Sequence, residues 1–98
     1  MDRTTQENIF DLTVEKMREI MFAKGDDYAT ADRLSNFKQA GTMCGLTPEL
    51  NCLSHIATKV ARLGVLLDGQ TPQNESIEDS LIDLANYSLL LLMIRKDI

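Results

Sequence analysis

The last third of the chain, residues 74–94, constrains the fold most, because it is helical in period and apolar on nearly every side. It begins with polar residues and ends in an almost unbroken apolar run, Tyr87–Ile94. On a period of 3.6 residues, four of its polar side chains fall on one side of the helix, with Tyr87 at the edge: Glu75, Asp79, Asp83 and Asn86. A helix that is apolar around most of its circumference must be covered by other helices.

Three further helices are predicted before this one. The first is capped by Thr4 or Thr5, runs to about Lys24 and ends at Gly25. The second runs from about Ala31 to Met43. The third begins at Thr47-Pro48-Glu49 and runs to about Asp68, with Gly69 after it. Asn74 or Ser76 is expected to cap the last helix, with Asp79 in capping-box spacing from Ser76. No segment alternates with a period of two, so we expect one all-α, four-helix bundle-like domain over residues 1–98.

Each predicted helix carries an apolar stripe that is expected to be buried. In the first helix the stripe is Phe10, Val14, Met17 and Met21, with Ile9 and Ile20 beside it; in the second it is Leu34, Phe37 and Ala40; in the third it is Leu53, Ile56, Val60, Leu63 and Leu67. The last helix has more apolar circumference than three short neighbours can cover. We therefore expect a homo-oligomer whose interface contains Leu89, Leu91, Leu92 or Ile94.

Composition excludes several classes of function. A formal net charge of -5 argues against nonspecific nucleic-acid binding, which requires a basic surface. The apolar run at the end is too short to span a membrane, and Met1 is followed by polar residues rather than by a signal peptide. We expect a cytoplasmic protein with reduced cysteines. Cys44, Cys52 and His55 provide three soft ligands but no fourth, so we do not expect a zinc site.

Two polar clusters precede the last helix. The first contains Lys24, Asp26, Asp27 and Tyr28 and continues into Ser35, Asn36, Phe37 and Lys38. It is either a solvated connection whose aromatic rings plug the core, or a site where a lysine contacts phosphate and a ring stacks on a base. The second contains His55, Lys59 and Arg62, on the side of the third helix opposite its apolar stripe. It is either the solvent-exposed side of that helix or a site where two cations bind a phosphate.

The acidic stripe of the last helix forms a third cluster. Glu75 and Asp79 complement the helix dipole near its N-terminus. Asp83 lies deeper and is followed by Asn86 and Tyr87. If the last two helices pack antiparallel, Asp83 is expected to pair with Lys59 or Arg62 and thereby to orient a cation toward a ligand.

The order of these patches resembles the small phage proteins of the first nucleotide modification associated domain family. The patches are Lys24–Tyr28, Asn36-Phe37, Lys59–Leu63, Asn74–Ser76 with Asp79, and Asp83–Tyr87. The resemblance implies an all-helical phage or prophage protein of nucleotide or modified-base metabolism. It also implies that one site is lined by Lys24, Asp27, Tyr28, Lys59, Arg62, Glu75, Asp79, Asp83 and Asn86.

A more distant resemblance is to the MazG-type all-α nucleoside triphosphate pyrophosphohydrolases, whose last helix also carries an acid followed by an aromatic residue and leucines. Those enzymes hold Mg²⁺ with four acids on two helices. Here Ser80 stands where one of the acids is required, and the preceding helix offers His55, Lys59 and Arg62, which would repel the metal.

These patterns predict a protein that binds a nucleotide or a nucleotide-derived phosphate without a cofactor. The expected ligand-binding residues are Lys24, Asp27, Tyr28, Asn36, Phe37, Lys59, Arg62, Asp83 and Asn86. A phage origin adds the variant that the protein sequesters a nucleotide signal. Two alternatives are a Mg²⁺-dependent pyrophosphohydrolase that uses Glu75, Asp79 and Asp83, and a helical oligomeric interaction module without a small ligand. No catalytic nucleophile with its base is visible in the sequence.

Overall fold

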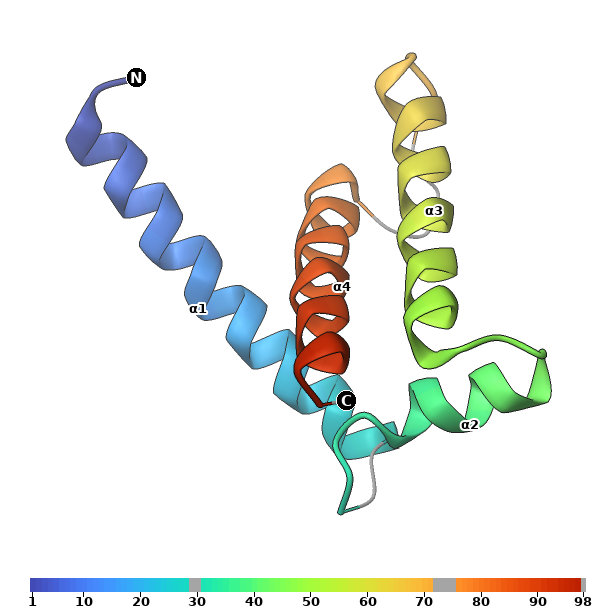
Figure 1. Ribbon diagram of the computed structural model, residues 1–98. Coiled ribbons are helices and arrows are strands. Elements are labelled where there is room, and N and C mark those ends of the chain that lie inside the picture. The colour runs from blue at the N-terminus through green and yellow to red at the C-terminus, as the bar shows by residue number, and fades with distance from the viewer. Residues whose placement is uncertain (29–30, 72–75, 98) are drawn as a thin grey trace.

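The computed structural model describes residues 1–28, 31–71 and 76–97, and of residues 27 and 28 only the backbone. These residues form four helices and no strand: α1 (Arg3–Tyr28), α2 (Ser35–Met43), α3 (Pro48–Leu67) and α4 (Ile77–Asp97) (Figure 1). The prediction of an all-α, four-helix fold is confirmed. In the same part of the chain, no helix is both long enough and apolar enough to span a membrane.

The ends of α3 lie where the sequence predicts them. The Thr47 side chain accepts a hydrogen bond from the backbone N–H of Leu50 at 3.1 Å, and Pro48 occupies the first helical position. The helix ends at Leu67, and Gly69 takes a positive φ of 107°, which a residue with a side chain rarely adopts. At the start of α4, Ser76 Oγ accepts from the backbone N–H of Asp79 at 3.0 Å. Asn74, the other predicted cap, lies outside the described residues.

Three predicted boundaries are wrong. The first helix begins at Arg3 rather than after Thr4 or Thr5, and the Asp2 side chain accepts from the backbone N–H of Thr5 at 2.8 Å. The helix predicted to end at Lys24 continues as α1 to Tyr28, because Gly25 keeps a negative φ and does not turn the chain. The second helix begins at Ser35 rather than at Ala31. Asp32 is the cause, because its side chain accepts from the Leu34 N–H at 3.0 Å and its carbonyl accepts from the Ser35 N–H at 3.1 Å. Such local bonds hold the backbone in a turn.

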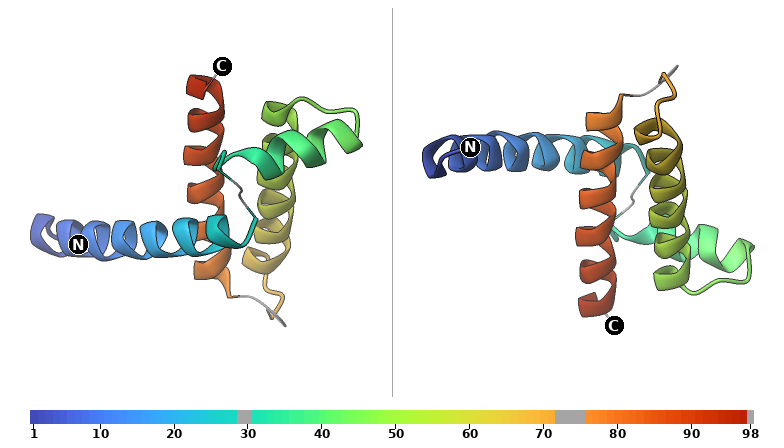
Figure 2. Two further views of the ribbon diagram at one scale, coloured as in Figure 1. Left: turned by 90° about the horizontal axis from the view of Figure 1, so that it is seen from below. Right: turned by 90° about the horizontal axis from the view of Figure 1, so that it is seen from above.

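The helices pack around α4. α3 runs antiparallel beside it, α2 packs against α3, and α1 crosses α4 on the other side, with its N-terminal half projecting beyond the other helices (Figures 1 and 2). The main core consists of Leu34, Phe37, Cys52 and Ile94, against which Tyr87, Leu90 and Leu91 pack. A buried hydrogen bond of 3.1 Å from Asn51 Nδ2 to the Phe37 carbonyl joins α2 to α3.

Several predicted buried stripes face solvent. In α1, Ile9, Phe10 and Val14 are exposed, while Met17, Ile20 and Met21 are half-buried. In α2, Ala40 is exposed. In α3, Leu53, Val60 and Leu67 are exposed although Leu63 is buried.

The reason in α3 is the rotation of the helix toward α4. It docks through Cys52, Lys59, Leu63 and Leu66, and the Lys59 side chain is only 18% exposed because it reaches a carboxylate of α4. The side of α3 that the sequence predicts to face solvent is therefore partly the side that packs against α4. Pairing with an opposite charge on the neighbouring helix, and not the apolar period alone, therefore determines which side of α3 docks.

Two glycines of the fold provide a matched test. A Cβ at Gly41 would lie 2.8 Å from the backbone oxygen of Leu46, where the chain passes from α2 to α3, whereas a Cβ at Gly64 in α3 would meet nothing within 4 Å. We expect Gly64→Ala to raise the free energy of unfolding by about 0.5–1 kcal/mol, because alanine favours helix. Gly41→Ala is expected to lower it by about 1–3 kcal/mol, because a backbone atom must move. Chemical denaturation of both variants checks this, and shifts of the same sign would contradict it.

Candidate functional site

A cavity of about 90 Å³ opens between α1, α2 and α4. It brings together five of the predicted ligand-binding residues, Lys24, Asn36, Phe37, Asp83 and Asn86. The remaining lining residues are Ile20, Met21, Gly25, Arg33, Tyr87 and Leu90. Residues more than 50 positions apart in the chain meet here only because α1 crosses α4 (Figure 2).

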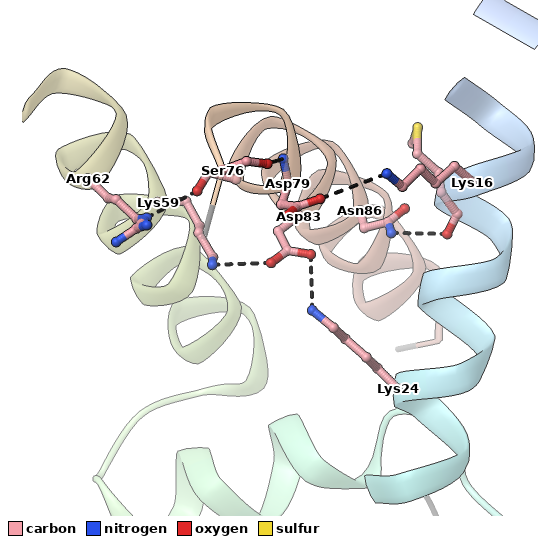
Figure 3. A network of polar contacts seen from close by, with 10 residues as sticks. Lys16, Lys24, Lys59, Arg62, Ser76, Asp79, Asp83 and Asn86 are labelled. Carbon is pink, nitrogen blue, oxygen red and sulfur yellow. Dashed lines mark hydrogen bonds and ion pairs between the residues drawn. The ribbon is translucent and has the colours of Figure 1, made fainter. Parts of the chain in front are cut away.

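Asp83, which lines the cavity, stands at the centre of a network of polar contacts (Figure 3). It lies on α4, is 8% exposed, and accepts from Lys24 Nζ of α1 at 3.0 Å through one carboxylate oxygen. Its other oxygen lies 3.1 Å from Lys59 Nζ of α3. Of the two cations proposed for it from the sequence, Asp83 therefore pairs with Lys59. One carboxylate and two ammonium groups leave a net positive charge at this point.

The pKa of Asp83 reflects two opposing effects. Burial by itself would raise the pKa of this carboxyl. Hydrogen bonds and attraction from Lys24 and Lys59 favour the ionised form more strongly, and hold the pKa of Asp83 below its ordinary value of 3.8. Asp83 is therefore ionised at neutral pH and fixes the position of both lysines.

Asn86, one turn further along α4, presents an acceptor without a partner. Its Nδ2 donates to the backbone carbonyl of Met17 in α1 at 3.0 Å, which fixes the orientation of the side-chain amide (Figure 3). Its Oδ1 is buried, and in the described part of the chain it is the only buried side-chain N or O atom without a hydrogen-bond partner. Such an atom costs stability unless a donor reaches it.

Aromatic rings form another part of the site. Phe37 is buried and meets the exposed His55 ring edge-on, with the centroids 6.2 Å apart. His55 in turn stacks on Tyr87 at 5.2 Å with the planes 6° apart. Burial is the main cause of the raised pKa of Tyr87, whose phenol is neutral at physiological pH. Phe37 and Tyr87 both line the cavity and can contact a flat apolar group.

Arg33 is a cavity residue that sequence reasoning missed. Its guanidinium pairs with Asp26 at 2.6 Å and lies over the Phe22 ring at 5.8 Å from the centroid. It passes so close to Gly25 that a Cβ there would lie 2.5 Å from Arg33 Nη2. The residue stands in an irregular connection, where no helical period shows which way a side chain points.

Other predicted residues lie elsewhere. Lys59 reaches Asp83 from the α3 side and does not line the cavity. Arg62 donates from Nε to Ser80 Oγ at 3.2 Å and also does not line it. Lys38 pairs with Asp32 and Asp97. The side chains of Asp27 and Tyr28 lie outside the described residues, as does Glu75.

The acids considered for Mg²⁺ have cationic partners where they are described. Asp79 lies 3.8 Å from Lys16 Nζ, and Asp83 is held between two lysines (Figure 3). Over residues 1–28, 31–71 and 76–97, no three His, Cys, Asp or Glu side chains are grouped so as to hold a metal ion. Cys44 is exposed and Cys52 is buried.

Replacing Asp83 tests the shared carboxylate. We expect Asp83→Asn to lower the free energy of unfolding at pH 7 by about 2 kcal/mol, because Lys24 and Lys59 lose their common counter-charge. Asp79→Asn is the control, since its half-exposed ion pair is worth less than about 1 kcal/mol.

The pH dependence of these variants follows from the lowered pKa of Asp83. Because this pKa is lowered on folding, its stabilising contribution is present above the ordinary value of 3.8 and is lost as the pH falls through the folded value. The difference between wild type and Asp83→Asn should therefore shrink in denaturant titrations below about pH 4. A difference that is unchanged down to roughly pH 2 would contradict the assignment.

The two cysteines should differ in reactivity. Burial raises the pKa of the Cys52 thiol to about 11, and its Sγ lies 3.4 Å from the Tyr87 carbonyl oxygen. At pH 8 only about one Cys52 in a thousand is thiolate, so a thiol reagent should modify exposed Cys44 and leave Cys52 until denaturant is added. In Cys44→Ser the rapid modification by the thiol reagent should disappear. Rapid modification of this variant would contradict the packing of Cys52.

No protein-family model matches the chain, and no match was found among curated proteins or solved structures. The resemblances to the nucleotide modification associated proteins and to the MazG-type enzymes therefore remain predictions. What the protein binds must be argued from the geometry of this cavity.

Proposed function

We propose that the cavity binds a phosphate-bearing small molecule of the nucleotide type. The observation that carries this proposal is that Asn86, whose buried Oδ1 has no hydrogen-bond partner, lines the same cavity as the cationic side chains of Lys24 and Arg33. The chain as a whole is acidic, yet Lys24 and Arg33 come from separate segments to the same opening. A residue with an unsatisfied acceptor and two cations around one cavity suit a ligand with a hydrogen-bond donor at one end and an anion at the other.

The size of the cavity limits how such a ligand is held. A volume of about 90 Å³ is smaller than the roughly 150 Å³ cavity that accommodates benzene, so it receives one group and leaves the rest of the ligand outside. In our proposal the edge of a base enters, donates an N–H to Asn86 Oδ1 and lies against Phe37 or Tyr87. The phosphate remains at the opening, where Lys24 and Arg33 are 55% and 45% exposed. Asp83 orients Lys24 and is itself partly neutralised by Lys59.

This arrangement favours binding over turnover. A Mg²⁺-dependent pyrophosphohydrolase needs carboxylates that are free to coordinate, whereas Asp83 is engaged by two lysines. Binding without hydrolysis fits a phage or prophage protein that acts in nucleotide or modified-base metabolism or sequesters a nucleotide signal in the cytoplasm. We retain Arg62, Asp27 and Tyr28 as predicted ligand contacts. Separately from the ligand, we retain the prediction of a homo-oligomer through the last helix.

Thermal unfolding in the presence of a panel of nucleotides tests the proposal. A ligand that binds only the native state raises the midpoint temperature of unfolding. At a free concentration one hundred times its Kd, it raises the free energy of unfolding by about 2.7 kcal/mol. We expect one class of nucleotide to raise the midpoint equally with and without Mg²⁺. The ligand-induced shift should be lost in Lys24→Ala, each variant being compared with its own ligand-free midpoint.

Lys16→Ala is the matched control, because Lys16 lies on the same helix, is similarly exposed and pairs with Asp79 outside the cavity. It should keep the full shift. A midpoint shift that requires Mg²⁺ would instead favour the pyrophosphohydrolase. Release of pyrophosphate from the nucleotide would then establish that activity. If no nucleotide raises the midpoint, or if Lys16→Ala loses the shift as completely as Lys24→Ala, the proposal fails.

A further inference from the structure

The single chain exposes far more surface than a compact protein of its size. Its accessible surface is 7072 Å², whereas a folded monomer of 11.0 kDa exposes about 5,600 Å² by the usual scaling with mass. Its radius of gyration is 15.1 Å, against about 13 Å for a compact chain of this length. The excess of about 1,450 Å² needs a physical explanation.

A large exposed segment is the arm, which we define as residues 3–16 of α1 and in which every residue except Thr13 is exposed. The arm projects beyond α4 and is not covered by α2 or α3 (Figure 2). Ile9, Phe10 and Val14 are 49%, 65% and 43% exposed. At helical spacing they continue the stripe of Met17, Ile20 and Met21, with which α1 docks beside α4. The apolar stripe of α1 therefore extends beyond the part of the helix that packs against α4.

A second uncovered apolar stripe lies on the outer face of α4. Leu81, Leu89 and Leu92 are 47%, 41% and 50% exposed, and their spacing puts them on one side of the helix. Asp83 and Asn86, which face the cavity, lie on a different side. The arm and the outer face of α4 are thus two exposed apolar stripes of one chain. The helices that carry them, α1 and α4, cross at an angle (Figure 2).

We infer that a second copy of this chain covers both surfaces, the arm of each copy packing along the outer face of α4 of the other. A reciprocal contact of this kind is self-complementary, as a two-fold interface requires. If each copy buries its excess of about 1,450 Å², the interface totals about 2,900 Å², within the range of obligate homodimers and well above that of weak contacts. This inference does not depend on the proposed ligand.

The molar mass in solution tests the inference directly, in ligand-free buffer. By light scattering or sedimentation the wild-type chain should have a mass of about 22 kDa, twice 11.0 kDa, or a multiple of it. Phe10→Asp in the arm and Leu89→Asp in α4 should each return the mass to that of one chain. Leu67→Asp is the control, because Leu67 is 68% exposed at the end of α3, outside both surfaces, and should leave the mass unchanged.

A wild-type chain that is monomeric at micromolar concentration would overturn the inference. So would dissociation by Leu67→Asp with no effect of Phe10→Asp, because the partner would then cover α3 instead. Nucleotide binding with a monomeric mass would separate the failure of this inference from that of the proposed function.

Cross-linking keeps the test decisive if an aspartate variant does not fold. In a Cys44→Ser background, a chain with Phe10→Cys and a tagged chain with Leu89→Cys are refolded together and treated with a short bismaleimide. The mixed pair should give a product that contains both chains. Phe10→Cys with Leu67→Cys is the matched control and should give none. Absence of the mixed product in the first pair, or equal yield in both pairs, would overturn the arrangement.

Discussion

The arrangement of the helices depends on one buried carboxylate. Asp83 of α4 accepts from Lys24 of α1 on one side and pairs with Lys59 of α3 on the other, so three helices meet at one side chain. An ionised group at this depth is tolerated only if it is paired. Lys59, whose side chain is 18% exposed, would also be unfavourable there without Asp83. The network therefore selects how α1 and α3 are rotated about their axes, a choice that a few aliphatic contacts would leave poorly specified.

This constraint explains where sequence reasoning succeeded and where it did not. Helix ends that depend on local bonds, such as Thr47 at the start of α3, could be read from neighbouring residues. The buried side of α3 could not, because its apolar period points to Leu53 and Val60 whereas the helix docks through Lys59. The sequence did predict that Asp83 pairs with Lys59 or Arg62, but it did not show that this pair turns the basic side of α3 toward α4.

The candidate site, too, could be predicted from the sequence only in part. Lys24, Asn36, Phe37, Asp83 and Asn86 were predicted as ligand contacts and do meet at one cavity. They were predicted because they lie in polar clusters and in the patches that resemble the nucleotide modification associated family. Arg33 was missed because it lies in a connection whose path depends on Asp32 and on the absence of a side chain at Gly25. The unpartnered state of Asn86 Oδ1 also depends on how far α1 lies from α4, which no local pattern encodes.

The position of α1 raises a final energetic question. Beyond its half-buried apolar residues, α1 is joined to α4 by the Lys24–Asp83 and Lys16–Asp79 ion pairs and by the bond from Asn86 to the Met17 carbonyl. The half-exposed Lys16–Asp79 pair contributes less than about 1 kcal/mol, and a helix as short as the arm is marginal in water when nothing packs on it. The apolar side chains of the arm therefore stabilise α1 only where another surface covers them. If that surface belongs to a second copy, folding and association are linked, and the stability of the protein must rise with chain concentration.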